Sequence, residues 1–332
     1  MPALSMLVHA IPPVPDVRDT TRREFFALLA AAGLVTAGCG AETGAAPQRS
    51  TRTVAGGAGP VEVPVRPQRV VTLGEALTGH LASVGLLPVG AQEGMAAWLD
   101  AYRSLLPPEA DVESIVPVGV AETPNLELIA QLDPELILIE RDAMAFHEKL
   151  SRIAPTVVID RPSNADWRTA FDQAVEAADR ADEAAVVRDR YHQAVARVPE
   201  AARQTTVTFL RGRGADGFRI DGTGAFAGDV AAEAGFAVDN GGAGGRPSEH
   251  GYVAYSLEQL SAVTGDVIVV PTRPGVSGTE GLEDSPLWPG LPAVRSGRVL
   301  RLPNAVYNGG TYVAAQLLVQ ALSEGVLSPS SG

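Results

Sequence analysis

The chain has 332 residues, of which 45% are hydrophobic and 20% charged, and this composition is typical of a globular protein of about two domains. Its formal net charge of −13 argues against nucleic acid as a partner, because phosphates are bound by basic surfaces. The single cysteine, Cys39, excludes a disulfide within the chain.

The N-terminal segment has the order of an export signal. Arg22 and Arg23 precede two phenylalanines and an apolar run of small residues that is too short to span a bilayer as a mature helix. The paired arginines are typical of the twin-arginine export signal. Cys39 follows "TAG" and resembles the cysteine of a bacterial lipobox. We therefore predict that residues 1–38 are removed and that a lipid on Cys39 holds the protein at the outer face of the cytoplasmic membrane. The alternative is a buried cysteine in a helix.

Residues 39–60 are rich in Gly, Ala, Pro and Thr and predict a flexible stalk. Strands and helices then alternate through residues 61–162, and the strands are apolar without alternation. This pattern predicts an α/β lobe with a parallel sheet covered on both faces. The expected strands are 69–73, 88–91, 135–140 and 156–160, and the expected helices are 74–86, 125–132 and 144–153.

Residues 163–202 predict one long helix between two lobes. Asn164 or Asp166 is suited to cap it, and apolar residues recur from Trp167 at steps of three and four. A helix of about 33 residues would extend roughly 50 Å. The alternation restarts over residues 203–328, which predicts a second α/β lobe. Its expected strands are 206–210, 266–271 and 298–303, and its expected helices are 225–236, 256–263 and 311–324, with a short turn or helix at 287–294.

Each lobe contains a copy of one short pattern. "NLELIAQLDPELILIE" and "SLEQLSAVTGDVIVVP" both begin with Leu-Glu and end in an apolar strand after a turn. Two copies, one in each lobe, favour a duplicated architecture. The acids at their heads are Glu127 and Glu258, and each also suits the positive end of a helix dipole.

No motif indicates catalysis. "GRGADG" at 212–217 fits a dinucleotide fingerprint, but a strand pattern follows it where a helix is required, so a glycine-rich hairpin is the better interpretation. His80, His147 and His250 lack the local spacing of metal ligands. No paired acids and no Ser/His/Asp set stand out, so the sequence predicts neither an enzyme nor a bound cofactor.

The layout resembles the periplasmic-binding-protein family that serves ABC importers of iron–siderophores, haem and cobalamin. The most specific segments are "PNLELIAQLDPELILI" and "LPAVRSGRVLRL", and the resemblance covers about residues 61–325. It implies the class III architecture, a rigid helical hinge, a ligand between the lobes and a monomer. It also implies that Glu127 and Glu258 dock on arginines of a permease.

Ligands of open α/β sheets bind beyond the carboxyl ends of strands, and polar or aromatic residues follow these ends in both lobes. Arginines donate to the oxygens of a ferric siderophore, and aromatic rings cover its apolar parts. The predicted ligand-binding residues are Glu75, Trp98, Arg141, Arg211, Arg213, Arg246, Tyr252, Arg273, Asn304 and Tyr307.

The sequence thus predicts an exported lipoprotein that captures a ferric siderophore and delivers it to an ABC permease. The nearest alternative is haem or cobalamin, where Tyr252, Tyr307 or His250 would be candidates to bind the haem iron. A second is direct binding of metal ions through the histidines. A third, from another class, is an exported α/β enzyme, which a nucleophile paired with a base in the cleft would reveal.

Overall fold

The computed structural model of the chain describes residues 50–242 and 247–327. The predicted signal, Cys39 and Arg246 lie outside these residues. The first described element is an antiparallel hairpin, in which Thr51 pairs with Pro64 and Val54 with Val61. The predicted stalk is therefore wrong for residues 51–60. The strands are β1 (Thr51–Val54) and β2 (Val61–Pro64), and Val54 and Val63 are buried because they join the core beside them.

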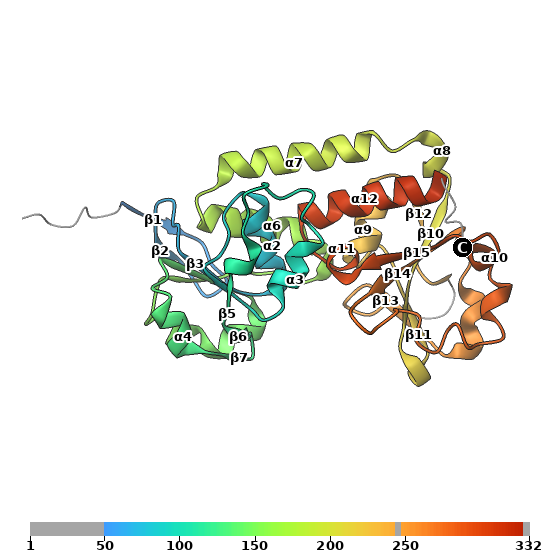
Figure 1. Ribbon diagram of the computed structural model, residues 1–332, viewed down its shortest axis with the longest axis horizontal. Coiled ribbons are helices and arrows are strands. Elements are labelled where there is room, and N and C mark those ends of the chain that lie inside the picture. The colour runs from blue at the N-terminus through green and yellow to red at the C-terminus, as the bar shows by residue number, and fades with distance from the viewer. Residues whose placement is uncertain (1–49, 243–246, 328–332) are drawn as a thin grey trace, which may run out of the picture. The chain divides into compact units, whose positions relative to one another are not determined.

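The N-terminal lobe, on the left in Figure 1, contains a parallel sheet of five strands, whose order is β5-β4-β3-β8-β9. The central strand at 70–73 and its neighbour at 136–139 consist entirely of buried residues, which explains their continuous apolar sequence. The strands are β3 (Val70–Leu73), β4 (Gly90–Ala91), β5 (Val116–Pro117), β8 (Leu136–Ile139) and β9 (Thr156–Val158), with β6 (Gly119–Val120) and β7 (Thr123–Pro124) in a small hairpin. The helices are α2 (Glu75–Ser83), α3 (Met95–Asp100), α4 (Leu126–Gln131) and α5 (His147–Leu150), with 3-10 turns η1 (Val112–Ser114) and η2 (Arg141–Phe146).

The predicted long helix is divided. A 3-10 turn η3 (Asn164–Asp166) leads into α6 (Trp167–Ala177), and α7 (Ala181–Ala196) follows after a break. Asp179 lies in the break with φ of 55°, in the left-handed region that ends a helix. Its carboxylate accepts a hydrogen bond from the Arg66 backbone N–H at 3.1 Å, which ties the break to the N-terminal lobe. The segment is helical as predicted, but one continuous helix of 33 residues is wrong.

The C-terminal lobe contains a mixed sheet of six strands, ordered β13-β11-β10-β14-β15 with β12 pairing with β10. The β10, β12, β14 and β15 strands are parallel, whereas β11 and β13 are antiparallel additions. The parallel-type sheet predicted for this lobe is thus extended by two antiparallel strands. The strands are β10 (Thr206–Gly212), β11 (Phe218–Asp221), β12 (Ala237–Val238), β13 (Tyr252–Tyr255), β14 (Val267–Thr272) and β15 (Val299–Pro303). The helices are α8 (Glu200–Arg203), α9 (Phe226–Glu233), α10 (Pro292–Arg295), α11 (Asn304–Tyr307) and α12 (Tyr312–Leu327), with 3-10 turns η4 (Gly214–Asp216), η6 (Leu257–Ala262) and η7 (Trp288–Gly290).

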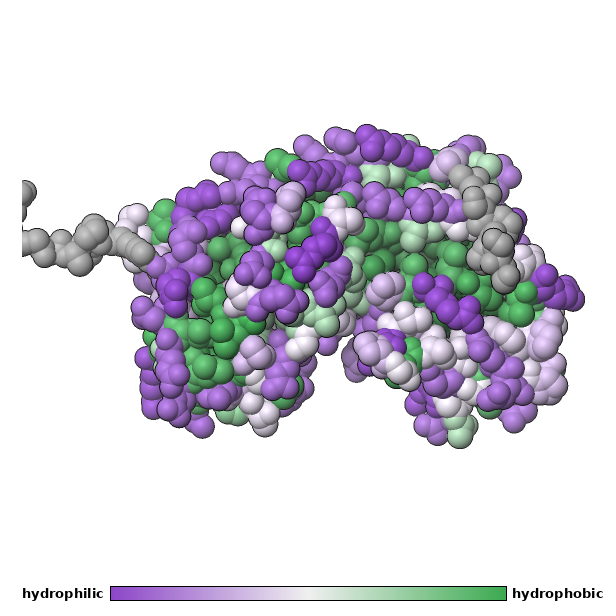
Figure 2. Space-filling model, in the orientation of Figure 1, coloured by the Kyte–Doolittle hydropathy of each residue, from purple (hydrophilic) through white to green (hydrophobic). Residues whose placement is uncertain are grey.

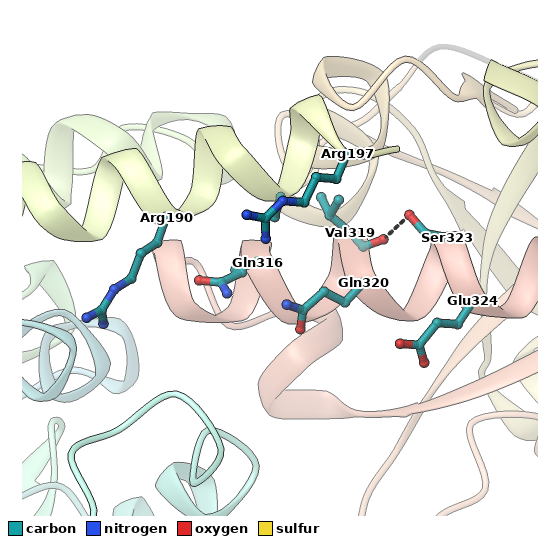
Figure 3. Close-up of a pocket in the computed structure, with 8 residues that line it drawn as sticks. Arg190, Arg197, Gln316, Val319, Gln320, Ser323 and Glu324 are labelled. Carbon is teal, nitrogen blue, oxygen red and sulfur yellow. Dashed lines mark hydrogen bonds between the residues drawn. The ribbon is translucent and has the colours of Figure 1, made fainter. Parts of the chain in front are cut away.

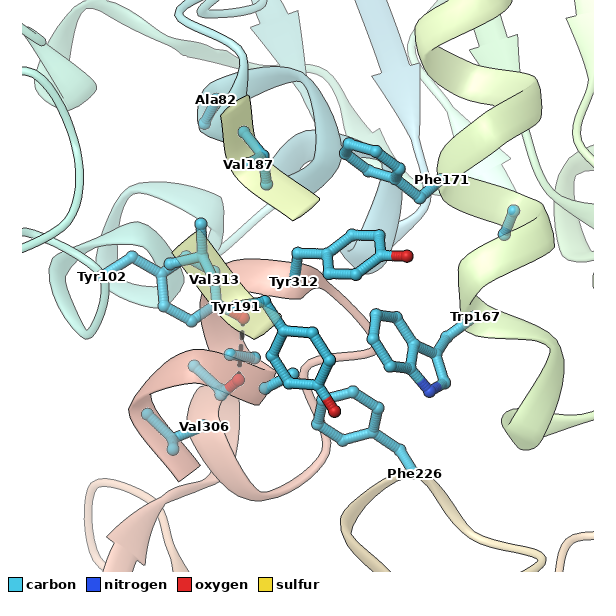
Figure 4. Close-up of a cluster of buried hydrophobic side chains, with 14 of the residues drawn as sticks. Ala82, Tyr102, Trp167, Phe171, Val187, Tyr191, Phe226, Val306, Tyr312 and Val313 are labelled. Carbon is cyan, nitrogen blue, oxygen red and sulfur yellow. Dashed lines mark hydrogen bonds between the residues drawn. The ribbon is translucent and has the colours of Figure 1, made fainter. Parts of the chain in front are cut away.

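One aromatic cluster connects the elements of the two lobes (Figure 4). The ring of Trp167 on α6 lies edge-on to Tyr312 on α12 at 4.8 Å and to Phe226 on α9 at 5.4 Å between centroids. Phe171 and Tyr191 also contact Tyr312. The indole N–H of Trp167 donates to Asp229 at 2.9 Å, so this buried tryptophan is also satisfied in its polar atom. The hydrophobic core at the junction is therefore shared by both lobes.

Candidate ligand-binding site

Three parallel strands of the N-terminal lobe deliver charged side chains to one edge of the sheet. Glu75 follows β3 at the start of α2, Glu140 follows β8, and Arg161 comes shortly after β9. Because β3, β8 and β9 run parallel, their carboxyl ends meet at the same edge. Gly74 precedes Glu75, and a Cβ built on it would lie 3.0 Å from the Glu140 carboxyl carbon, so glycine keeps the two turns close.

Glu140 is the most enclosed acid of this edge. Arg161 Nη2 donates to its Oε2 at 3.5 Å, and its Oε1 is buried without a hydrogen-bond partner among the described residues. Burial raises the pKa of Glu140, and the positive charge of Arg161 opposes this shift. The carboxylate is thus poorly solvated and only partly compensated by the protein.

Glu75 is accessible, yet its pKa is also raised. The cause is desolvation by the surrounding walls, opposed by the charges of Arg273 and Arg161. Since Arg273 follows β14 of the C-terminal lobe, the charge environment of Glu75 depends on both lobes.

Three adjoining cavities form the space that we call the interlobe cleft. The largest has a volume of about 320 Å³ and is lined by Glu75, Trp98, Arg273 and Asn304 among others. A second shares Glu75 with it, and a third shares Glu140 and Arg161 with the second. Figure 2 shows the surface hollowed between the two lobes, on the side away from α7. The cleft combines an apolar wall with a few charged groups, as small-molecule sites do.

Trp98, the aromatic residue of the largest cavity, is held by two successive hydrogen bonds that reach the other lobe. The Trp98 indole N–H donates to the Tyr102 hydroxyl at 3.1 Å, and this hydroxyl donates to the Ala305 carbonyl at 2.7 Å. Ala305 belongs to α11, so a contact of the C-terminal half orients a ring of the N-terminal lobe. Asn304, its neighbour, is only 6% exposed, and its Oδ1 has no hydrogen-bond partner among the described residues.

The C-terminal lobe places two arginines directly opposite each other. Arg211 on β10 pairs in register with Arg219 on the antiparallel β11. β10 and β14 run parallel, and Phe209 pairs with Val269. Arg211 therefore lies at the carboxyl end of β10, at the same edge of the sheet as Thr272, which lines the cleft. Like charges in such a pair are unfavourable unless an anion compensates them.

A single buried carboxylate serves both arginines. Asp221 Oδ1 lies 2.9 Å from Arg219 Nε, whereas its Oδ2 is 3.7 Å from Arg211 Nη2 and accepts the Tyr307 hydroxyl at 2.9 Å. Arg211 Nε and Nη2 have no hydrogen-bond partner among the described residues, although the side chain is only 17% exposed. The cluster therefore has one positive charge in excess and donors to spare for an anionic oxygen.

The prediction that Tyr307 contacts the ligand does not agree with its burial. Its side chain is 1% exposed, with its ring under the Arg211 guanidinium at 5.1 Å, and both burial and the neighbouring Asp221 raise its pKa. It is therefore unavailable to a ligand or a haem iron and instead supports Arg211. Tyr252 is half-buried below Arg219, whose guanidinium lies 4.4 Å from the ring centre.

The remaining predicted ligand residues are placed unequally. Glu75, Trp98, Arg273 and Asn304 come together in one cavity. Arg141 lines the neighbouring one but is exposed and paired with Asp160 at 3.0 Å. Arg213 is exposed at the tip of the β10–β11 hairpin, which is the hairpin predicted from "GRGADG". Its role in ligand binding stays a prediction.

Sequence reasoning missed Arg161, Arg219 and Asp221. Arg161 follows the strand at 156–158, so the rule that selected Arg141 was sufficient to find it. Arg219 and Asp221 had no such signal, because they face Arg211 only through the antiparallel pairing of β11. That pairing is a tertiary property of the hairpin.

Glu127 and Glu258 are exposed at matching places in the two lobes. Glu127 lies in the first turn of α4, which the Asn125 side chain caps by accepting the Leu128 N–H at 3.0 Å. Glu258 lies in the first turn of η6, which has a Ser256–Gln259 capping box, and hydrogen bonding to Ser256 lowers its pKa. The predicted helix at 256–263 is a 3-10 turn, but the acid is presented in the same way.

A separate groove lies between α7 and α12, away from all predicted ligand residues (Figure 3). It is lined by Arg190, Arg197 and Gln316 among others, and the Ser323 hydroxyl donates to the Val319 carbonyl within α12 at 2.8 Å.

Histidines do not assemble a metal centre in residues 50–242 and 247–327, where no three His, Cys, Asp or Glu side chains are placed to hold a metal ion. His80 is buried in the core against Phe171, and the ring of His250 stacks on Tyr252. Among the described helices, none combines the length and the apolar character needed to cross a bilayer.

Two α/β lobes that share a core and enclose a ligand-sized cleft define a binding protein of the two-lobed class. The chain belongs to the periplasmic binding protein family, whose model matches residues 70–306. It is 26% identical over 286 residues to the Fe(3+)-citrate-binding protein YfmC of Bacillus subtilis, covering 82% of this chain and 86% of YfmC. It is 25% identical over 295 residues to the iron(3+)-hydroxamate-binding protein FhuD of the same organism, covering 84% of this chain and 88% of FhuD.

Solved structures share the fold. Staphylococcus aureus SirA complexed with staphyloferrin B superimposes with a TM-score of 0.64 at 24% identity, covering 83% of this chain and 99% of SirA. The petrobactin-binding protein YclQ of Bacillus subtilis gives a TM-score of 0.67 at 18% identity, covering 84% of this chain and all of YclQ. These likenesses confirm the predicted class III α/β architecture.

Proposed function

We propose that this chain is the extracytoplasmic binding protein of an ABC importer and that it captures a ferric siderophore in the interlobe cleft. The observation that supports this most directly is the Arg211–Arg219 pair around the single carboxylate of Asp221. Its N–H donors without a partner among the described residues suit the anionic oxygens that surround a chelated ferric ion. The curated relatives, named as ferric citrate and ferric hydroxamate binders, point to the same ligand class.

Binding in the cleft is non-covalent and includes no chemical reaction. Trp98 contributes an apolar face, the arginines of the C-terminal lobe donate hydrogen bonds, and the shared core behind the cleft limits the movement of the lobes. Release to the permease completes the cycle. Haem is a weaker candidate because Tyr307 is buried and already donates to Asp221.

A titration of intrinsic tryptophan fluorescence tests the ligand class. Ferric citrate, ferric hydroxamates, ferric catecholates, haem and cobalamin are added separately to the purified protein. We expect saturable quenching by a ferric siderophore, chiefly of Trp98, which lines the cleft. A Trp98→Phe variant should lose most of the quenching, because its remaining emission comes from Trp167 and Trp288, which are buried. Calorimetry should still detect binding by this variant. No saturation by any ferric complex would contradict the proposal.

Docking on the permease is proposed for Glu127 and Glu258. The support is their exposure, one in each lobe, at the start of matching segments. A double charge reversal, Glu127→Arg with Glu258→Arg, should abolish import of the ferric complex and leave its affinity for the purified protein intact. The matched control reverses Glu109 and Glu324, which are also exposed. Loss of ligand affinity in the first variant, or equal loss of import in the control, would reject the docking role.

Anchoring through Cys39 and a monomeric state complete the proposal. A Cys39→Ala variant should be exported and released into the soluble extracytoplasmic fraction, whereas the parent stays with the membrane. Light scattering of the released protein measures its mass. Membrane retention of the variant would contradict a lipid anchor at this cysteine.

A further inference from the structure

The N-terminal wall of the interlobe cleft is rich in carboxylates. One of its cavities, of about 290 Å³, is lined by Glu75, Glu122, Glu140 and Asp142 against a single guanidinium, that of Arg161. Arg161 pairs with Glu140. Glu75, Glu122 and Asp142 form no ion pair with any residue that the structure describes. This wall therefore presents a surplus of negative charge toward the bound ligand.

An independent observation comes from the cavity next to this wall, which shares Glu75 with it. Asn304 comes from the other end of the chain and lines the cavity that shares Glu75. More than nine-tenths of its surface is buried, and its Oδ1 has no donor among the described residues. Glu140 Oε1 is likewise a buried acceptor without a donor. Buried polar groups are costly when left unpaired, so each oxygen would be stabilised by an N–H or O–H donor, Asn304 beside the cavity of about 320 Å³ and Glu140 beside the acidic one.

A metal ion does not meet this need. Among the described residues, these carboxylates do not form a group of three or more ligands placed to hold one. An ammonium group does meet it, since it carries three donors and one positive charge, and hydrogen bonds between charged partners are stronger than neutral ones. Desolvation raises the pKa of Glu75 and of Glu140, and a bound cation would stabilise their ionised forms.

The opposite wall has the reverse character. Arg273 directly follows β14 and is exposed where it lines the cleft, and Arg211 and Arg219, on β10 and β11 of the same sheet, share one carboxylate. The two walls therefore favour opposite charges on the two sides of one ligand.

We propose that the preferred ligand is a ferric complex with a protonated amine arm, held with its iron-bound oxygens toward Arg211 and Arg219 and its amine toward Glu75, Glu140 and Asp142. This inference rests on the proposed function and adds the chemical class of the siderophore to it. Asn304 supplies a further acceptor beside Glu75 at the junction of the lobes.

A pair of probes with identical iron coordination tests the inference. The first is the ferric complex of desferrioxamine B, which ends in a primary amine, and the second is the ferric complex of its N-acetylated form, which is neutral at that end. We expect the amine form to bind the purified protein about tenfold more tightly in a calorimetric titration. A Glu75→Gln, Asp142→Asn double variant should bind both forms equally, at the affinity of the acetylated one. A Glu109→Gln variant is the control and should retain the tenfold preference.

Each outcome decides the matter. Equal binding of the two forms by the parent protein overturns the inference, as does an equal loss for both forms in the double variant. Binding of wholly anionic complexes alone, such as ferric citrate, also overturns it while leaving the proposed function in place. If no ferric complex binds, the proposed function itself fails, and circular dichroism of the same samples verifies that the protein is folded.

Discussion

The two lobes that border the interlobe cleft obtain their charged residues by different routes. In the N-terminal lobe, Glu75, Glu140 and Arg161 are residues that follow parallel strands, so they lie in turns at the edge of the sheet. In the C-terminal lobe, Arg211 and Arg219 lie within an antiparallel hairpin and face each other across it. Glu140 is enclosed, but its partner Arg161 is only half-buried and has a second hydrogen-bond partner, so the acid can be lost without leaving a buried charge uncompensated. Strand residues are locked to a partner, so their charges are tied to the stability of the lobe.

The largest expected effect is therefore in the C-terminal wall. Asp221→Ala removes the only carboxylate that pairs with Arg211 and Arg219 among the described residues, and with it the acceptor of the Tyr307 hydroxyl. We expect the free energy of unfolding to fall by about 3–5 kcal/mol, because the uncompensated charges remain buried. Denaturant unfolding followed by circular dichroism measures this. Asp284→Ala, at an exposed position of the same lobe, is the control, and a similar small change in both variants would refute the contrast.

The next effect concerns ligand affinity. Arg211→Gln retains a polar side chain but removes the guanidinium whose Nε and Nη2 are free of partners among the described residues. We expect affinity for a ferric siderophore to fall by about 1.5–3 kcal/mol, the contribution of hydrogen bonds to a charged group. Calorimetry provides the value. Arg295→Gln, exposed on α10, should bind like the parent, and an unchanged affinity in Arg211→Gln would remove the arginine pair from the site.

A third prediction tests the core behind the N-terminal wall. His80 is fully buried without a hydrogen-bond partner on either ring nitrogen among the described residues, and burial lowers its pKa from 6.5 to about 3. Between these pH values the unfolded chain binds a proton that the folded chain excludes. The free energy of unfolding should therefore fall with falling pH in this window, by up to about 1.4 kcal/mol per pH unit from this residue.

The comparison of the parent with His80→Leu isolates this contribution. The variant keeps an apolar group beside Phe171 and should show a shallower loss of stability between pH 6.5 and 3. Denaturation midpoints measured across this range give the two slopes. Parallel pH profiles for the two proteins would show that His80 titrates normally in the folded state.

The smallest effect is expected for Glu140→Gln in the N-terminal wall. Neutralising this carboxylate removes a poorly solvated charge, and the half-buried Arg161 keeps a hydrogen bond to Asn164 at 3.4 Å. We expect the free energy of unfolding to change by less than about 1 kcal/mol, in contrast to Asp221→Ala. The same denaturant experiment measures it. If Glu140→Gln lowered the free energy of unfolding as much as Asp221→Ala, both carboxylates would be required to compensate buried arginines.

Much of the fold was predictable because its signals are local. The apolar runs at 70–73, 136–139 and 267–272 are strands, and the turn chemistry around "GRGADG" gives a hairpin. The stalk and the long helix were mispredicted for reasons that are not local. Residues 51–54 become a strand only by pairing with 61–64, and the break at Asp179 is stabilised by Arg66, more than 100 residues earlier.

The site divides in the same way. Glu75, Arg273 and Asn304 were predictable because each follows a strand, and parallel strands bring their carboxyl ends together. Trp98 was recognised only as a loop aromatic, and its orientation depends on Tyr102 and Ala305. Tyr307 also follows a strand, yet the packing of α11 buries it under Arg211.

The sequence by itself determined the α/β class, the duplicated plan with Glu127 and Glu258 at matching places, and the polar residues beyond the strand ends. These depend on hydrophobic period and chain order, which neighbouring residues encode. Only the tertiary structure decided which charged and polar groups lie together beside the cleft and which of them lack a partner. Burial and partner geometry leave Glu140 and Asn304 short of donors and Arg211 short of an acceptor, and both properties depend on atoms that are distant in the chain.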